Sequence, residues 1–106
     1  MRYTVILVPD AEDRISALVP AAPGCFSVGD TATEALDHVR NAIRGWLEVE
    51  AIAGRQPPVE TSAVVTTGVA QALAIIDEMK DAGELPASHG YELEVTTVDV
   101  NPAIPA

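Results

Sequence analysis

The fold is decided by residues 31–47, TATEALDHVRNAIRGWL. Thr31 and Glu34 have the spacing of a capping box, in which Thr31 accepts a hydrogen bond from the Glu34 amide and the Glu34 side chain reaches back. A helix is therefore predicted to begin here and to run to about Gly54. Inside it, Gly45 is unfavourable by about 1 kcal/mol relative to alanine, so we expect a packing reason for this glycine. The apolar side chains that recur at helical spacing predict one buried face: Leu36, Val39, Ile43, Trp46 and Leu47.

Three strands are expected before this helix. Residues 3–8 and 15–19 flank a short polar turn, and they predict an antiparallel hairpin. Residues 19–26 contain two prolines and Gly24, which predict a structured turn. Residues 26–28 are expected to form the third strand. Both faces of the first strand are apolar, so we expect either a second helix or another subunit to cover the outer face.

The second half of the chain predicts further elements. Residues 54–58, GRQPP, should end the helix and begin an extended connection, because two prolines cannot continue helical hydrogen bonding. We predict a short edge strand at 63–66 and a second helix at 68–82. The last strand is expected at 91–100, with a bulge near residues 96–97, where the apolar alternation changes phase.

Together these elements predict a single domain, residues 1–106, of the α+β class. Its expected architecture is a three-stranded antiparallel sheet with a closing C-terminal strand, a long helix packed on one face, and an extra helix before the last strand. A hydrophobic share of 48% and a charged share of 21% are those of a packed globular protein. A domain this small gains stability from self-association, so a dimer or tetramer is expected.

The charge of the chain restricts its partners. With 16 acidic and 6 basic side chains, the net charge is −10, which disfavours direct binding to nucleic acid and steers a basic protein toward the surface. A simpler interpretation is that the charge keeps the protein soluble. The only cysteine, Cys25, allows no internal disulfide, so we expect a cytoplasmic protein. No signal peptide is expected, and no segment approaches the ~20 apolar residues of a membrane span.

No catalytic constellation stands out, so we predict a protein that is not an enzyme and has no cofactor. His38 lies four residues after Glu34, and an exposed side-chain pair is favoured over a ligand or a base. Solvent exposure is expected for His89. A buried structural role is favoured for Cys25, because a reactive thiol needs a nearby positive charge or helix N-terminus.

An acidic cluster is the one alternative that would make the chain a nuclease. Carboxylates in such numbers can bind a metal ion, and the candidates are Asp10, Glu12, Asp13 and Asp30. Turn chemistry and the helix dipole explain these residues more simply, so no metal site is assigned. Metal-dependent RNA cleavage that is lost on Asp10→Asn or Asp30→Asn would establish the nuclease.

Much of the first half of the chain resembles the HicB-like antitoxin family. The matching segments are 3–7 (YTVIL), an acidic turn, 19–20 (VP), 23–27 (PGCFS), 29–31 (GDT), 34–36 (EAL) and 46–47 (WL). The positions taken as the family motif, with a structural role, are Pro23, Gly24, Cys25, Gly29, Asp30, Thr31, Glu34 and Ala35. The resemblance implies a degraded ribonuclease-H-like fold without the catalytic carboxylates of the nuclease.

The resemblance also implies a function. It predicts a non-catalytic subunit that binds and masks a small basic RNA-cleaving toxin of the HicA type, and that assembles into dimers or higher oligomers. Two departures from the family pattern are expected: no DNA-binding domain is predicted after Val100, and the predicted helix at 68–82 stands where the family passes more directly to the last strand. An orphan homo-oligomeric module of unknown ligand, without a toxin partner, is the alternative.

Overall fold

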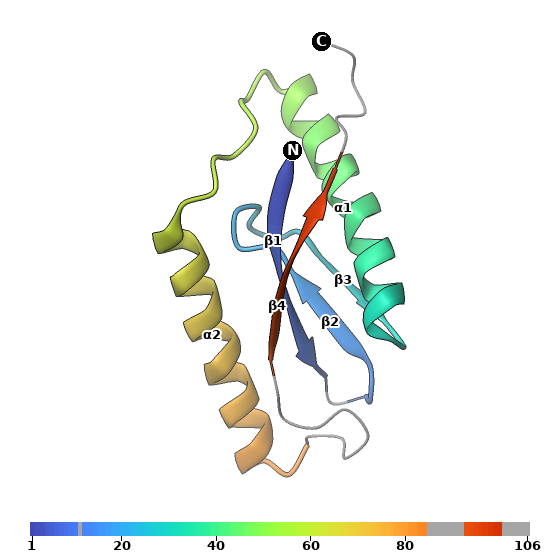
Figure 1. The fold of residues 1–106 in the computed structure, drawn as a ribbon, viewed down its shortest axis with the longest axis vertical. Helices are drawn as coiled ribbons and strands as arrows, with labels where there is room; N and C mark the ends of the chain where they lie inside the picture. The colour runs from blue at the N-terminus through green and yellow to red at the C-terminus, as the bar shows by residue number, and fades with distance from the viewer. Residues whose placement is uncertain (11, 85–92, 101–106) are drawn as a thin grey trace.

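The computed structural model describes residues 1–10, 12–84 and 93–100. The elements in chain order are β1 (Arg2–Pro9), β2 (Ile15–Leu18), β3 (Phe26–Gly29), α1 (Ala32–Ile52), α2 (Ser62–Asp81) and β4 (Glu94–Asp99). The strands form one antiparallel sheet in the order β3-β2-β1-β4, and the helices lie on opposite sides of it (Figure 1). The predicted α+β class and closing strand are therefore confirmed, with helix on two faces of the sheet instead of one.

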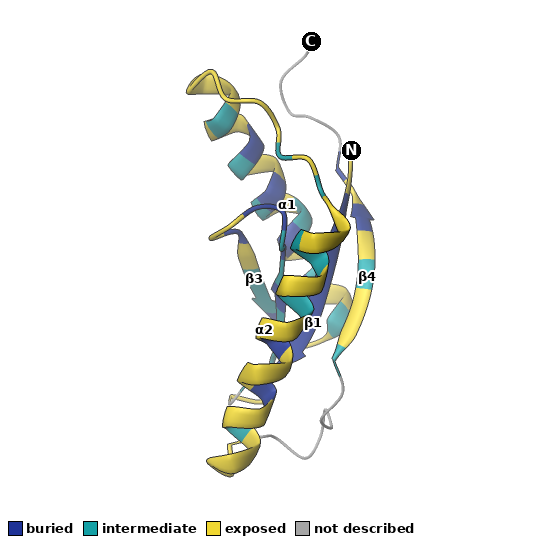
Figure 2. Ribbon diagram, turned by 90° about the vertical axis from the view of Figure 1, so that its left-hand side faces the viewer, coloured by how far each residue is buried: buried dark blue, intermediate teal, exposed yellow. Residues whose placement is uncertain are grey.

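Strand β1 is central, which explains why both of its faces are apolar. Alternate side chains of a strand point to opposite faces. Val5 and Leu7 pack with α1 in the larger core cluster, whereas Ile6 and Val8 pack with α2 in a second cluster. Of the two covers expected for the outer face, the second helix thus lies over β1 (Figure 2).

Helix α1 begins as the capping box predicts. The Thr31 side chain accepts a hydrogen bond from the Glu34 amide at 3.1 Å. The Glu34 carboxylate accepts from the amide of Asp30, at 3.4 Å, one residue before the cap. The buried face of α1 contains Ala35, Val39, Ile43 and Leu47, while Leu36 and Trp46 are only partly buried against the same core.

The predicted edge strand at 63–66 is wrong, because these residues form the first turns of α2. Their β-branched side chains favour a strand by local propensity alone. The Thr61 hydroxyl nevertheless caps the helix by accepting from the Val64 amide at 3.1 Å. The second helix therefore begins at Ser62 and not near residue 68. Packing on the sheet overrides the weak strand preference.

The bulge expected near residues 96–97 is also wrong. Strand β4 pairs with β1 in an unbroken register from Arg2↔Asp99 to Leu7↔Glu94. The sequence changes phase because the two faces of β4 are covered unequally. Val98 is buried in the α1-side core, whereas Val95, on the other face beside α2, is 47% exposed.

The Tyr3 phenol gives the fold a pH dependence on the alkaline side. Burial, together with the nearby Glu60 carboxylate, raises the pKa of Tyr3 above its ordinary value. The unfolded chain therefore ionises this group first, and its contribution to stability is complete below about pH 10 and is lost as the pH rises further.

We expect Tyr3→Phe to flatten the loss of stability above about pH 10. At neutral pH the variant should be at least as stable as the parent, because the Tyr3 hydroxyl is buried and has no hydrogen-bond partner among the described residues. Urea unfolding at a series of pH values measures both effects. An unchanged alkaline slope would contradict this account of Tyr3.

A carboxylate holds the connection between the two helices against β1. Glu60 accepts from the Thr4 amide at 2.7 Å and from the Thr4 hydroxyl at 2.8 Å. The paired register of β2 with β1 ends at Leu18↔Ile6, just before the turn at Pro20. The Glu60 side chain thus satisfies a strand amide near the point where the neighbouring strand has ended.

Glu60→Ala is expected to lower the free energy of unfolding by about 2 kcal/mol, because it leaves the polar groups of the buried Thr4 without an acceptor. The matched control is Glu48→Ala on the exposed side of α1, which should change stability by less than about 0.5 kcal/mol. Chemical denaturation of both variants makes the comparison, and equal losses would contradict the role of Glu60.

Candidate functional site

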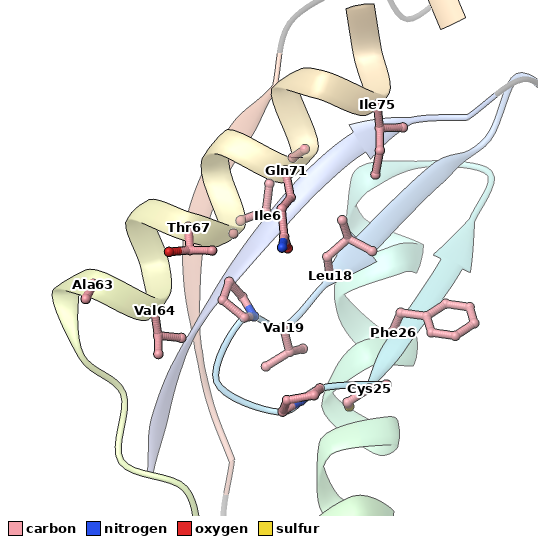
Figure 3. Close-up of a pocket in the computed structure, with 15 residues that line it drawn as sticks. Ile6, Leu18, Val19, Cys25, Phe26, Ala63, Val64, Thr67, Gln71 and Ile75 are labelled. Atoms are coloured by element: carbon pink, nitrogen blue, oxygen red, sulfur yellow. The ribbon is translucent and has the colours of Figure 1, made fainter. Parts of the chain in front are cut away.

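An apolar groove lies between α2 and the sheet, and the sheet contributes lining residues from β1, β2 and β3. Its volume is about 640 Å³. The residues that line it are Ile6, Leu18, Val19, Pro20, Pro23, Gly24, Cys25, Phe26, Ala63, Val64, Thr67, Gly68, Gln71, Ala72 and Ile75. Figure 3 shows side chains of α2, among them Gln71 and Ile75, on one side of the groove, with Leu18 and Phe26 on the sheet side. None of the lining residues carries a formal charge.

The predicted turn before β3 builds one end of the groove. The Val19 amide donates to the Cys25 carbonyl at 3.3 Å, and the Cys25 amide donates to the Ala22 carbonyl at 2.9 Å. Gly24 has a φ of 82°, a left-handed conformation that favours glycine. The turn is therefore closed by its own backbone and presents Pro20 to α2.

Helix α2 approaches this turn closely at a glycine. A Cβ atom added at Gly68 would lie 2.8 Å from Cγ of Pro20 and 3.3 Å from Cδ1 of Ile6. The absence of a side chain thus lets the first half of α2 come down on the sheet. Farther along the helix, Ala72 and Ile76 are buried in the second core cluster.

The rim of the groove exposes large apolar side chains. Phe26 is 61% exposed on β3, and Ile75 is 44% exposed on α2. Aromatic and aliphatic side chains at the rim of an apolar groove are typical of surfaces that bind proteins. The arrangement offers shape and apolar area for contact with another protein.

The acidic residues considered for a metal site serve local structure. Asp10 accepts from the amides of Glu12 and Arg14 at 2.9 and 3.0 Å, and its carboxylate lies 3.3 Å from the Arg14 guanidinium. Asp30 precedes the N-cap residue of α1, and its amide donates to the Glu34 carboxylate. Within residues 1–10, 12–84 and 93–100, no three His, Cys, Asp or Glu side chains gather to hold a metal ion.

His38 is exposed, but it does not act through a pair with Glu34 as expected. Its Nδ1 lies 2.8 Å from the Val28 carbonyl on β3, while the Glu34 carboxylate is bound to the Asp30 amide. The imidazole thus connects α1 to the free edge strand of the sheet, a contact between elements that helical spacing does not reveal. His89 lies outside the described residues.

Cys25 is buried, as predicted. Burial raises the pKa of its thiol, so the thiolate form is scarce at neutral pH. We expect the folded protein to react with an aromatic disulfide reagent at least about tenfold more slowly than the urea-unfolded chain, since the thiolate is the reacting species. The reaction releases an aromatic thiolate, which is followed by its absorbance. Equal rates of release from the folded and the unfolded chain would contradict a buried Cys25.

The eight residues of the family motif fall into two places. Pro23, Gly24 and Cys25 line the groove. The other five lie where β3 meets the beginning of α1: Gly29, Asp30, Thr31, Glu34 and Ala35. The family motif alone does not predict that residues of α2 complete the groove. The signal available was the apolar run 69–76, which is longer than one buried helix face requires.

Comparison with known proteins gives a consistent result. The family model described as "HicB_like antitoxin of bacterial toxin-antitoxin system" matches residues 3–85. A UPF0150 protein of Thermoplasma acidophilum is 46% identical over 48 residues, which is 45% of this chain and 70% of the relative.

Solved structures extend the likeness to the fold. The N-terminal domain of the Burkholderia pseudomallei antitoxin HicB superposes with a TM-score of 0.55 at 21% identity, over 94% of this chain and all of that one. A chain of the HicA3 and HicB3 toxin-antitoxin complex superposes with a TM-score of 0.57 at 17% identity, over 96% of this chain and all of that one.

Among the helices of the described residues, none has the length and apolar character needed to span a membrane.

Proposed function

Since the chain belongs to the HicB-like antitoxin family, we propose that it is a non-catalytic, cytoplasmic binding subunit that masks a small basic toxin of the HicA type. The match of the family model over residues 3–85 is the observation that carries the proposal. In this role the domain catalyses no reaction itself. It presents a surface that covers the active site of another protein.

Two features of the chain support this role. A HicA3 and HicB3 complex contains a chain of the same fold, so this architecture is compatible with binding a toxin. The net charge of −10 favours the approach of a basic protein and raises the rate of encounter. The apolar groove supplies area that such a partner can bury.

Co-expression with the adjacent reading frame tests the proposal. If that frame encodes a small basic protein, its induction alone should arrest growth, and co-expression of this chain should restore growth. The two proteins should then co-purify as one complex. A neighbouring basic protein that is harmless, or whose toxicity this chain leaves unchanged, would contradict the antitoxin function.

A homo-oligomeric module without a toxin is the second candidate. It is favoured by apolar side chains near the C-terminal end of α1, where Val49 is 60% and Ile52 is 83% exposed. Their burial between copies would add apolar area that a small domain lacks. Sedimentation of the purified chain should then show a dimer or tetramer that Ile52→Lys dissociates. A monomer at high concentration would exclude this candidate.

A further inference from the structure

We propose that the groove between α2 and the β2–β3 side of the sheet is the docking surface for an amphipathic segment of the basic partner, with apolar side chains inserted and cationic side chains around them. This inference rests on the proposed function and specifies the surface that performs it. The uncharged lining, the exposed apolar rim and the excess of acidic charge are the three observations behind it.

The lining determines what can enter the groove. No charged side chain contributes to it, so an inserted apolar side chain meets no buried charge that must lose its water. Phe26 and Ile75 stand at opposite sides of the opening and are already exposed. A large aromatic side chain beside a preformed apolar groove is the arrangement from which binding hot spots are built.

The charge around the groove favours a cationic partner. Glu78 follows Ile75 by three positions, which places both on one side of α2, and its side chain is exposed. Four of the six basic residues are already in ion pairs with carboxylates of the chain: Arg2, Arg14, Arg40 and Arg55. The charge that remains unmatched is therefore acidic, and it complements a basic partner.

The same charge argues against a second copy as the occupant. Two chains of net charge −10 repel each other at contact, where their separation is shorter than the Debye length of ~8 Å at physiological salt. A basic partner gains from this charge at the same separation. Binding through the groove should therefore weaken as salt is added, whereas self-association would strengthen.

Two residues of α2 provide a matched test. Ile75 lines the groove and is 44% exposed, whereas Leu73 is 49% exposed and is not among the lining residues. Ile75→Glu and Leu73→Glu make the same change of charge in the same helix. Any difference between them in binding therefore reports the groove and not the overall charge. Phe26→Glu repeats the test from β3.

The experiment uses the full chain and a synthetic helical peptide of about 18 residues, with leucines at i, i+3, i+4 and i+7 and lysines elsewhere. A second peptide has glutamates in place of the lysines. We expect the lysine peptide to bind at least about tenfold more tightly than its twin, and more weakly at high salt. Ile75→Glu and Phe26→Glu should weaken binding about tenfold, while Leu73→Glu changes it less than about twofold.

Calorimetry measures the affinities, and circular dichroism verifies that the three variants melt at similar temperatures. Equal effects of Ile75→Glu and Leu73→Glu, or equal binding of the two peptides, would overturn the proposal. A chain that is dimeric alone and becomes monomeric on Ile75→Glu would assign the groove to a second copy and also overturn it. Toxin neutralisation that survives Ile75→Glu would refute the docking surface and leave the antitoxin function standing.

Discussion

Gly29→Ala is expected to lower the free energy of unfolding by about 3 kcal/mol, at the upper end of what overpacking usually does. A Cβ atom at Gly29 would lie 2.4 Å from the Ala35 amide nitrogen and 2.8 Å from the Glu34 carbonyl carbon. Both are backbone atoms of the first turn of α1, so no side-chain rotation relieves the clash. The end of β3 and the start of α1 would have to separate.

The melting temperature should fall by roughly 12 °C or more, since a domain of this size loses roughly 4 to 8 °C for each kcal/mol. Gly45→Ala is the matched control, because an added Cβ there meets nothing within 4 Å. It lies inside α1, where alanine is the better helix former, so it should stabilise the protein by up to about 1 kcal/mol. Calorimetric melting of the two variants should give opposite signs, and a tolerated Gly29→Ala would contradict the close contact.

Gly29 and Gly45 also show what a sequence pattern can and cannot predict. The packing reason expected for Gly45 is absent among the described residues, whereas Gly29, identified only as part of the family motif, has the closest backbone contact of any glycine described. Helical spacing gives the face on which Gly45 lies. It does not give the distance to a neighbouring element, which depends on how strand and helix are joined.

The first half of the fold was predictable because its signals are local. The capping box at Thr31, the hairpin and the turn around Gly24 each follow from a few neighbouring residues, and the structure has all three. The beginning of α2 was not predictable in the same way. Residues 63–66 have strand propensity, and tertiary packing, of Val64 on the larger core cluster and of Gly68 beside Pro20, favours the helical conformation instead.

The groove could not be predicted from the sequence, for a related reason. Pro23, Gly24 and Cys25 were identified as motif residues, but the groove also requires Gln71 and Ile75 from a helix far along the chain. No spacing rule relates these two segments. The apolar character of both faces of β1 indicated that a cover was needed, and it left open whether that cover was α2 or another subunit.

Ile6→Ala tests whether α2 is that cover. Ile6 is fully buried, at 0% exposure, in the cluster with Val8, Ala72 and Ile76. Its truncation should lower the free energy of unfolding by about 3 to 4 kcal/mol, from lost apolar burial and from the cavity left behind. Ile52→Ala, at a position that is 83% exposed, should change it by less than about 0.5 kcal/mol.

Equilibrium urea unfolding followed by fluorescence of the single tryptophan, Trp46, measures both variants. The size of the Ile6 effect decides the question, because a side chain on a sheet face without α2 would be exposed to water. Truncating an exposed side chain leaves no cavity and loses little apolar burial. A loss below about 1 kcal/mol for Ile6→Ala would therefore mean that α2 does not cover β1 in solution, and the groove would lose one of its two walls.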